Sequence, residues 1–136
     1  MKILVTSGGT SEAIDSVRSI TNHSTGRLGK IITETLLAAG HEVCLIATKR
    51  AVKPEAHPNL SIREINNTND LLVVMQERVK DYQALIHSMA VSDYTPVYMT
   101  GLEEVQASSN LEDFLNKQNH QAKISSTDEV QVLFLK

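Results

Sequence analysis

Residues 2–10, KILVTSGGT, join an apolar run to a glycine-rich turn, and this junction decides the fold. Residues 2–6 predict a short buried strand, and SGGT at 7–10 is a turn signal. The following helix is expected only in STGRLGKIITETLLAAG, residues 24–40, with Ser24 or Thr25 as its cap. A crossover connection needs only a handful of residues, so the long polar segment before the helix is expected to bind something.

Strand and helix patterns continue to alternate along the chain. HEVCLIAT at 41–48 and LSIREIN at 60–66 predict strands. DLLVVMQERVKDY at 70–82 predicts a helix capped by Thr68 or Asn69, and QALIHSMAVSDY at 83–94 predicts a further strand. Such alternation predicts an α/β fold with a Rossmann-like, doubly wound and mostly parallel sheet.

The last third of the chain is less regular. Residues 96–110 fit no single pattern, LEDFLNKQ at 111–118 predicts a short helix, and VQVLFLK at 130–136 predicts a strand. That strand stops with the sequence, so we expect a single domain over 1–136 whose architecture is truncated at its C-terminus.

Composition excludes several classes of protein. The chain has 136 residues, 41% of them hydrophobic, and a net charge of −3, which gives no basic footprint for nucleic acid. Its single cysteine, Cys44, and its five unclustered histidines (23, 41, 57, 87 and 120) give no metal-ligand spacing. No apolar run is long enough for a signal peptide or a membrane span, so we expect a cytoplasmic protein.

Two glycine loops are the candidate binding elements. Gly8 and Gly9 follow the first strand at its carboxyl end, where ligands bind in open α/β sheets. Gly26 and Gly29 flank the start of the first helix, whose N-terminal amides attract anions. The loops therefore predict a phosphate or nucleotide site. The alternative is structural: Gly8 and Gly9 turn the chain, and Gly29 permits close packing of helix on sheet.

Known nucleotide fingerprints match poorly. The pattern G-x-G-x-x-G requires the helix to open directly after the strand, with an acidic residue at the end of the second strand. Here the connection is longer, and the second strand ends in ATKR, residues 47–50. Lys49 and Arg50 suit the 2′-phosphate of NADP, which leaves an NADP-binding oxidoreductase as one alternative. The P-loop pattern is absent.

Three segments resemble the phosphopantothenoylcysteine synthetase (phosphopantothenate–cysteine ligase) family. VTSGGTSEAIDSVRSITNHSTGRLGK at 5–30 resembles the family's opening motif, HSMAVSDY at 87–94 its Val-x-Asp-Tyr segment, and AKISS at 122–126 its Lys-Ile motif. The resemblance spans almost the whole chain and is closest to the single-function bacterial form. Family members continue well beyond a position like Lys136, so we expect the chain to lack the family's C-terminal part.

The resemblance implies a reaction. CTP, or alternatively ATP, activates the carboxylate of 4′-phosphopantothenate as an acyl-cytidylate, and the amine of cysteine then displaces CMP. Splitting one difficult acyl transfer into two steps lowers the barrier of each. Charge that develops on phosphates and an oxyanion calls for amide dipoles, a cation and Mg²⁺. A homodimer is also implied.

Roles for individual residues follow from the same resemblance. Ser24, with Gly8, Gly26 and Gly29, resembles the nucleotide-phosphate cradle. Asn22 resembles the asparagine that holds the activated intermediate, and Lys123 a loop lysine that neutralises the triphosphate. The phosphopantothenate contacts are implied for Met89, Ala90, Asp93 and, in trans from the second subunit, Arg18.

Each implied role has a structural alternative. Asn22 suits a turn, Asp93 suits a strand-end cap, and Lys123 suits a solvated loop position. Arg18 stands three residues after Asp15 and suits a local ion pair. A smaller residue is usual where Met89 stands, so main-chain contacts are expected there.

Three functions therefore remain open: the ligase or its substrate-binding part, the NADP-binding oxidoreductase, and a non-catalytic binding or assembly remnant of the ligase. Because the family's remaining strands and basic residues are missing from the 136 residues, we expect little ligase turnover from them alone.

Overall fold

A computed structural model describes residues 1–118, 123–125, 127 and 129–136. His120, and Ala122 and Ser126 of the AKISS motif, lie outside the described residues. The contacts within the chain group it into two compact units, where a single domain was predicted. We call Met1–Ser11 with Thr21–Ser92 the sheet unit, and Glu12–Ile20 with Asp93–Lys136 the hairpin unit.

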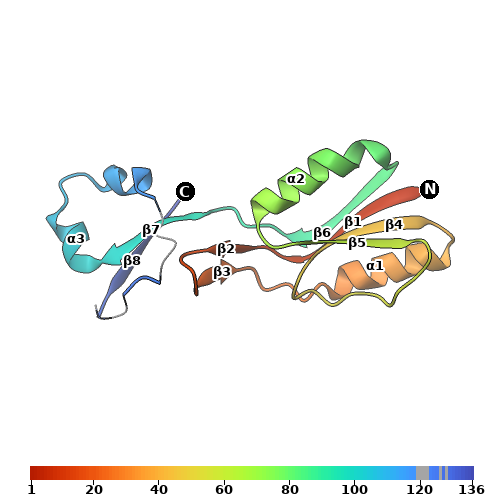
Figure 1. Ribbon diagram of the computed structural model, residues 1–136, viewed down its shortest axis with the longest axis horizontal. Coiled ribbons are helices and arrows are strands. Elements are labelled where there is room, and N and C mark those ends of the chain that lie inside the picture. Colours follow the sequence, from red (N-terminus) through yellow and green to blue (C-terminus); the bar gives the residue numbers. More distant parts are fainter. Residues whose placement is uncertain (119–122, 126, 128) are drawn as a thin grey trace. The chain divides into compact units, whose positions relative to one another are not determined.

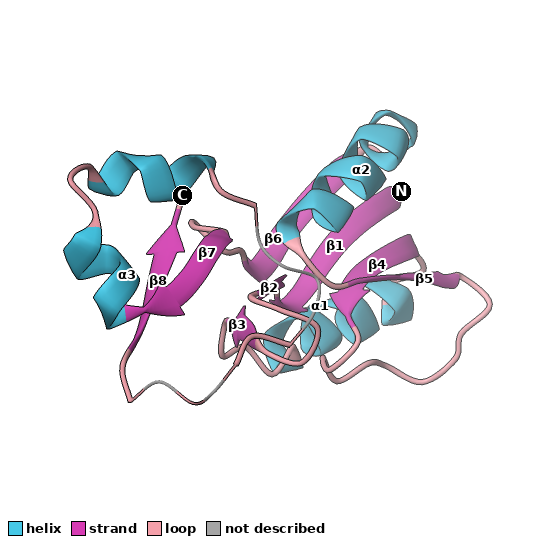
Figure 2. Cartoon of the chain, turned by 60° about the vertical axis from the view of Figure 1, so that its left-hand side comes forward, coloured by secondary structure: helices cyan, strands magenta, loops and turns pink. Residues whose placement is uncertain are grey.

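The sheet unit is built on four parallel strands in the order β5-β4-β1-β6 (Figure 1). Their bounds are β1 Lys2–Gly9, β4 Glu42–Thr48, β5 Leu60–Ile65 and β6 Ala84–Ala90. Helix α1, Arg27–Ala38, covers one face, and α2, Thr68–Arg78, covers the other (Figure 2). A 3₁₀ turn, η1 Val79–Asp81, follows α2. The predicted doubly wound, mostly parallel α/β sheet is confirmed.

Alternate residues of the strands feed two apolar layers, because successive side chains of a strand point to opposite faces. Between α1 and the sheet lie Ile3, Val5, Val43 and Leu45 from the strands and Leu37 from α1, all at most 7% exposed. The layer that includes Leu71 of α2 comprises Leu4, Cys44, Ile46, Ile65, Leu71 and Met89. β1 and β4 are therefore buried on both faces, as central strands of a parallel sheet are.

Both helix starts differ from the prediction. Gly26, not Ser24 or Thr25, precedes α1, with a φ of 77° and no side-chain cap. Asn67, not Thr68 or Asn69, caps α2, because only Asn67 has an acidic residue three positions on. Gly40 has the predicted left-handed conformation after α1, and its amide donates to Leu37 O.

The long polar connection between β1 and α1 is partly ordered as a small hairpin. β2, Ser11–Ala13, pairs with β3, Ser19–Thr21. Neither strand was expected, because each has only three residues and no apolar alternation to mark it.

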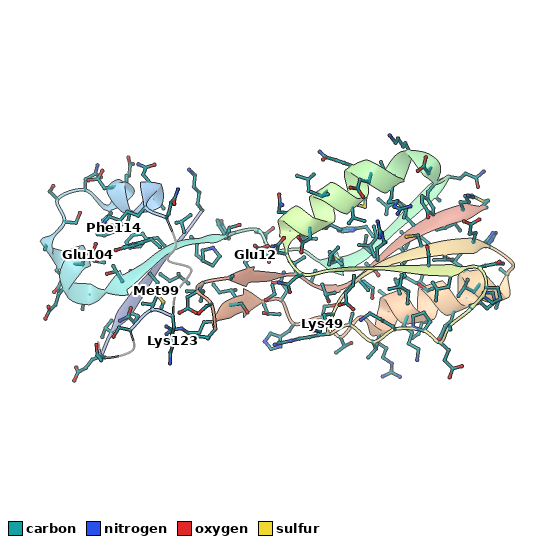
Figure 3. All side chains as sticks on the ribbon, viewed as in Figure 1. Glu12, Lys49, Met99, Glu104, Phe114 and Lys123 are labelled. Atoms are coloured by element: carbon teal, nitrogen blue, oxygen red, sulfur yellow. The ribbon has the colours of Figure 1, made fainter. Side chains whose placement is uncertain are left out.

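The hairpin unit contains the antiparallel pair β7, Pro96–Gly101, and β8, Gln131–Leu135, with α3, Leu102–Ala107, and η2, Leu111–Asn116. Its core is aromatic: Phe114, 2% exposed, stacks between Tyr98 and Phe134 at centroid distances of 5.9 and 4.7 Å. Figure 3 labels Phe114 and, from β7, Met99, which is also buried. The short helix predicted at 111–118 and the strand at 130–136 are both present.

Candidate functional site

The carboxyl end of β1 places the first glycine loop at the point where the sheet changes direction. β1 lies between β4 and β6, and ligands of doubly wound folds bind at such a switch point. Gly8 has a φ of 94°, and a β-carbon there would lie 2.8 Å from the β-carbon of Ala51. Glycine is therefore required at Gly8 by both conformation and space.

The second glycine loop opens α1 beside the first. Gly26 is buried, and its carbonyl accepts hydrogen bonds from Ser7 Oγ at 3.0 Å and from the Lys30 amide at 3.0 Å. The amides of Arg27, Leu28 and Gly29 precede that first helical bond and have no partner within the helix. The Arg27 amide donates to Thr25 Oγ1 at 3.4 Å, so the amides of Leu28 and Gly29 are the candidate donors. The N-terminus of α1, with no acidic residue in its first turn, therefore presents amide donors to an anion.

Gly29 serves the packing of helix on sheet. A β-carbon at Gly29 would collide with the side chain of Ser7 and lie 3.1 Å from Ser88 Oγ. Ser7 and Ser88 are paired across β1 and β6. Gly29 therefore permits the close packing named as its structural alternative, and it brings the first turn of α1 down onto the ends of these two strands.

Asn22 lies across the ends of β1 and β6. Its amide donates to Thr10 O at 3.1 Å, and its side-chain Nδ2 donates to Ala90 O at 3.1 Å. The Thr10 amide donates to the same Ala90 oxygen at 3.0 Å. A β-carbon on Gly9 would collide with the main chain of Asn22, so the glycine lets this segment cross the strand ends. The side chain of Asn22 is therefore fixed at the switch point.

A family model matches most of the chain. Residues 1–106 match the family described as "DNA/pantothenate metabolism flavoprotein C-terminal domain". The chain belongs to this family. The resemblance drawn from the three motifs is confirmed.

Two relatives of this chain are described as "Coenzyme A biosynthesis bifunctional protein CoaBC". The protein of Vibrio vulnificus is 31% identical over 94 residues, which are 69% of this chain and 23% of that protein. The protein of Thermococcus kodakarensis is 35% identical over 95 residues, 68% of this chain and 23% of that protein. The chain thus spans about a quarter of the length of these relatives.

Several solved structures share the fold of this chain. The "DNA/Pantothenate Metabolism Flavoprotein from Streptococcus pneumoniae" is 89% identical with a TM-score of 0.95, covering 100% of this chain and 59% of that one. The C-terminal domain of a CoaBC protein is 33% identical with a TM-score of 0.65, covering 71% of this chain and 48% of that one. Cab2 in complex with phosphopantothenate-cysteine, 20% identical with a TM-score of 0.63, shares the fold over 69% of this chain.

Most of the predicted site residues of this chain lie together in the sheet unit. Gly8, Asn22, Gly26, Gly29 and Ala90 meet at the ends of β1 and β6 and at the start of α1. Ser24 lies in the same loop, with its amide donating to Asn22 O at 3.1 Å. The side chain of Met89 packs in the core beside Leu71. Only the main chain of Met89, which pairs with Gly8 of β1, is therefore available to a ligand.

Arg18, Asp93 and Lys123 belong to the hairpin unit. Asp93 and Lys123 are exposed. Arg18 forms the local ion pair with Asp15 that was its structural alternative, with Nη2 to Oδ2 at 2.7 Å, and Nη2 also donates to Ile124 O at 2.6 Å.

Asp15 accepts the hydrogen bonds that hold Arg18 and Ile124 together. Burial raises the pKa of its carboxyl, but hydrogen bonds from the Ile124 amide, from the Arg18 side chain and from the amides of Val17 and Arg18 outweigh this. The pKa of Asp15 is consequently held well below its ordinary range, and the carboxylate stays charged at neutral pH.

Sequence reasoning missed two residues that build the site. Thr10 is fully buried, and its Oγ1 accepts from the Ser92 amide at 2.8 Å, which joins the segments that follow β1 and β6. Ala51 packs against both glycine loops. The signal for Thr10 was available, since it follows Gly8 and Gly9 directly; Ala51 is distant in sequence and carried none.

Two further observations concern the described residues. Across residues 1–118, 123–125, 127 and 129–136, no three His, Cys, Asp or Glu side chains gather as metal ligands. In the same part of the chain, every helix is too short or too polar to cross a lipid bilayer.

Proposed function

We propose that this chain forms the phosphate-binding and phosphopantothenate-binding part of a phosphopantothenate–cysteine ligase of coenzyme A biosynthesis. The observation that carries the proposal is the fixed Asn22 side chain beside the open N-terminus of α1, at the switch point of the sheet. The family assignment supports the same pathway, since the relatives are described as coenzyme A biosynthesis proteins.

The first step of the proposed reaction builds charge on phosphate. A carboxylate oxygen of 4′-phosphopantothenate attacks the α-phosphorus of CTP, a phosphorus–oxygen bond breaks, and pyrophosphate leaves. The amides of Leu28 and Gly29 in the first turn of α1, with Gly8 and the Ser24 side chain, would hold the phosphate oxygens. Amide dipoles fixed before the reaction stabilise developing charge without reorganising, which is the largest contribution in many enzymes.

The second step attacks the activated carboxyl carbon. The amine of cysteine adds to that carbon, the bond to CMP breaks, and an amide forms. Asn22 would orient the acyl group, because an amide side chain can donate and accept hydrogen bonds without carrying charge. Its bond to Ala90 O at 3.1 Å keeps the side chain in place before substrate arrives.

Mg²⁺ is expected to enter with the nucleotide. The described residues offer no carboxylate cluster for a resident ion. Mg²⁺ commonly binds through substrate phosphates and water with few protein ligands, so it belongs to the CTP complex in this proposal. ATP is the alternative nucleotide, since amide contacts to phosphates do not distinguish the base.

The residues of the hairpin unit complete the proposal. Arg18 would reach the phosphopantothenate of a second subunit, which requires a homodimer, and Asp93 would bind phosphopantothenate within its own subunit. Lys123, an exposed cation, would neutralise the triphosphate. A cytoplasmic location fits a coenzyme A biosynthesis enzyme and is part of the same proposal.

Thermal unfolding with ligands tests the proposal. We expect CTP with Mg²⁺ to raise the melting temperature, and 4′-phosphopantothenate to raise it further. At a hundredfold excess over the dissociation constant the stabilisation is about 2.7 kcal/mol. Asn22→Ala should remove the added effect of phosphopantothenate, whereas Asn69→Ala, on the exposed first turn of α2, should not.

The arms of this experiment separate the three functions. Stabilisation by NADPH and not by CTP would overturn the proposal in favour of an oxidoreductase. A melting temperature that does not change with CTP, ATP or phosphopantothenate would favour a non-catalytic remnant.

A further inference from the structure

The turn that follows β4 is held by one ammonium group. Lys53 Nζ donates to the main-chain oxygens of Thr48, Lys49 and Ala51, at 3.1, 3.0 and 3.2 Å. A lysine ammonium has three donors, so all of them are used on this turn. The Ala51 amide also donates to Thr48 O at 3.1 Å, which closes the same turn.

Lys53 differs from the cations beside it. Its side chain is 25% exposed, and Glu64 Oε2 of β5 lies 3.5 Å from Nζ. Lys49 and Arg50 are exposed, and Figure 3 shows Lys49 extending from the loop after β4. Three converging carbonyl oxygens repel one another, and a fixed cation between them removes that repulsion. Lys53 is therefore a structural cation, whereas its neighbours are solvated.

The turn held by Lys53 contacts both glycine loops. Ala51 is 5% exposed, and β-carbons built on Gly8 and Gly26 would lie 2.8 and 2.7 Å from its own β-carbon. The Val52 amide donates to Thr25 O at 2.9 Å, one residue before Gly26. The turn thus fixes the separation between the end of β1 and the start of α1.

We infer that Lys53 is a positioning residue for the phosphate-binding loops, acting through Ala51 on Gly8 and Gly26. This inference rests on the proposed function for its effect on nucleotide binding. Without the ammonium, the 48–51 turn relaxes, Ala51 shifts, and the two loops lose their spacing. Close-packed contacts transmit such a shift because few voids exist to absorb it.

The test compares Lys53→Met with Lys53→Arg. Methionine keeps an apolar stem but has no donor, and arginine restores a cation with several donors. In ¹⁵N–¹H spectra, we expect the Gly8 and Gly26 amide signals to move in Lys53→Met and to return toward their positions in Lys53→Arg. We expect CTP binding to weaken by about tenfold in Lys53→Met, because misplacing binding groups by about 1 Å is costly.

Two controls make the result specific. Lys80→Met removes an exposed lysine at η1 in the same unit and should leave both amide signals and CTP affinity unchanged. Ala51→Gly keeps Lys53 but removes the side chain that touches both loops, and it should reproduce the shifts if Lys53→Met does not fold.

The outcomes separate the inference from the proposed function. Unmoved Gly8 and Gly26 signals in a folded Lys53→Met or Ala51→Gly variant, with unchanged CTP affinity, would overturn the inference. Moved signals in a protein whose wild type binds no CTP would establish the positioning and overturn the proposed function.

Discussion

The two helices of the sheet unit begin in opposite ways. At α2, Asn67 Oδ1 accepts from the Asp70 amide at 2.8 Å, while Asp70 Oδ2 accepts from the amides of Asn66 and Asn67 at 2.9 and 3.2 Å. At α1, Gly26 offers no side chain, and Gly29 stands where α2 has Asp70, so the first turn of α1 has no acidic residue. The N-terminus of α2 is closed by the reciprocal cap of Asn67 and Asp70. That of α1 has no such cap: its Arg27 amide donates to Thr25 Oγ1 at 3.4 Å, and no acidic residue stands in its first turn.

This difference is informative because both helices have the same need. The first turn of a helix carries amide donors without helical partners, and the dipole there favours negative charge. In α2, Asn67 Oδ1 accepts from the first-turn amide of Asp70, and the Asp70 carboxylate provides the negative charge. α1 lies at the switch point of the sheet, where an internal carboxylate would exclude a ligand phosphate. The open start of α1 and the closed start of α2 therefore distinguish a binding terminus from a structural one.

Filling the start of α1 should have the largest effect. Gly26→Ala places a β-carbon in a left-handed conformation and 2.7 Å from Ala51 Cβ. Strain of about 1–2 kcal/mol and overpacking of about 1–3 kcal/mol together predict a loss of about 2–5 kcal/mol in the free energy of unfolding. Chemical denaturation measures this loss directly.

Gly40→Ala is the matched control for Gly26→Ala. Gly40 has a φ of 84°, yet a β-carbon there meets nothing within 4 Å. It should therefore show only the conformational strain, about 1–2 kcal/mol. Equal losses at Gly26 and Gly40 would mean that the contact with Ala51 carries no energy.

The loops show how far the sequence predicts this arrangement. Apolar periodicity located the four strands and two helices of the parallel sheet, because burial on one or both faces imposes a repeat on the residues themselves. Gly8 and Gly40 also indicated the turns in which they lie. The start of α1 was placed one or two residues early, since Ser24 and Thr25 have the right chemistry for a cap but Gly26 has the left-handed conformation found there.

What the sequence did not predict depends on contacts between distant residues. Lys53 has no feature that distinguishes it from Lys49 until the carbonyls around it are placed. Ala51 becomes important only because Gly8 and Gly26 meet it. Arg18 was assigned a role by resemblance and a partner by spacing, and the structure tests the partner.

Reversing the charge at the start of α1 should have the next largest effect. Arg27→Glu gives α1 an acidic first turn like that of α2, which should stabilise the helix by about 0.3–1 kcal/mol. The same carboxylate should repel a triphosphate and weaken CTP binding by about tenfold, or 1.4 kcal/mol. Calorimetric titration and denaturation measure the two effects separately.

Asn69→Glu, in the first turn of α2, is the corresponding change at the closed helix. CTP affinity should not respond to it. A similar loss of affinity in both variants would indicate general charge repulsion and remove the distinction between the two termini.

Removing the cap of α2 should have a smaller effect, confined to stability. Asn67→Ala loses the acceptor for the Asp70 amide, and such caps are typically worth about 1 kcal/mol. The free energy of unfolding should fall by that amount, with CTP affinity unchanged in the folded protein. A change in affinity would show that α2 and the binding terminus are coupled.

Asp15 extends the comparison to the hairpin unit. We expect its protonation to change the stability only in the acid range and not at neutral pH. Like Asp70, it accepts hydrogen bonds from main-chain amides, here those of Val17, Arg18 and Ile124. Because the pKa of Asp15 is lowered in the folded state, its stabilisation is present above the unfolded pKa, about 3.9. It is lost as the pH falls below that value. The carbon resonance of the Asp15 carboxyl, followed with pH, should titrate well below 4, and Asp15→Asn should abolish the associated acid-dependent shifts of the Val17 and Ile124 amides. A titration midpoint near the ordinary value for an aspartate would contradict this prediction. It would mean that the hydrogen bonds from these amides do not stabilise the Asp15 carboxylate as those from Asn66 and Asn67 are expected to stabilise that of Asp70.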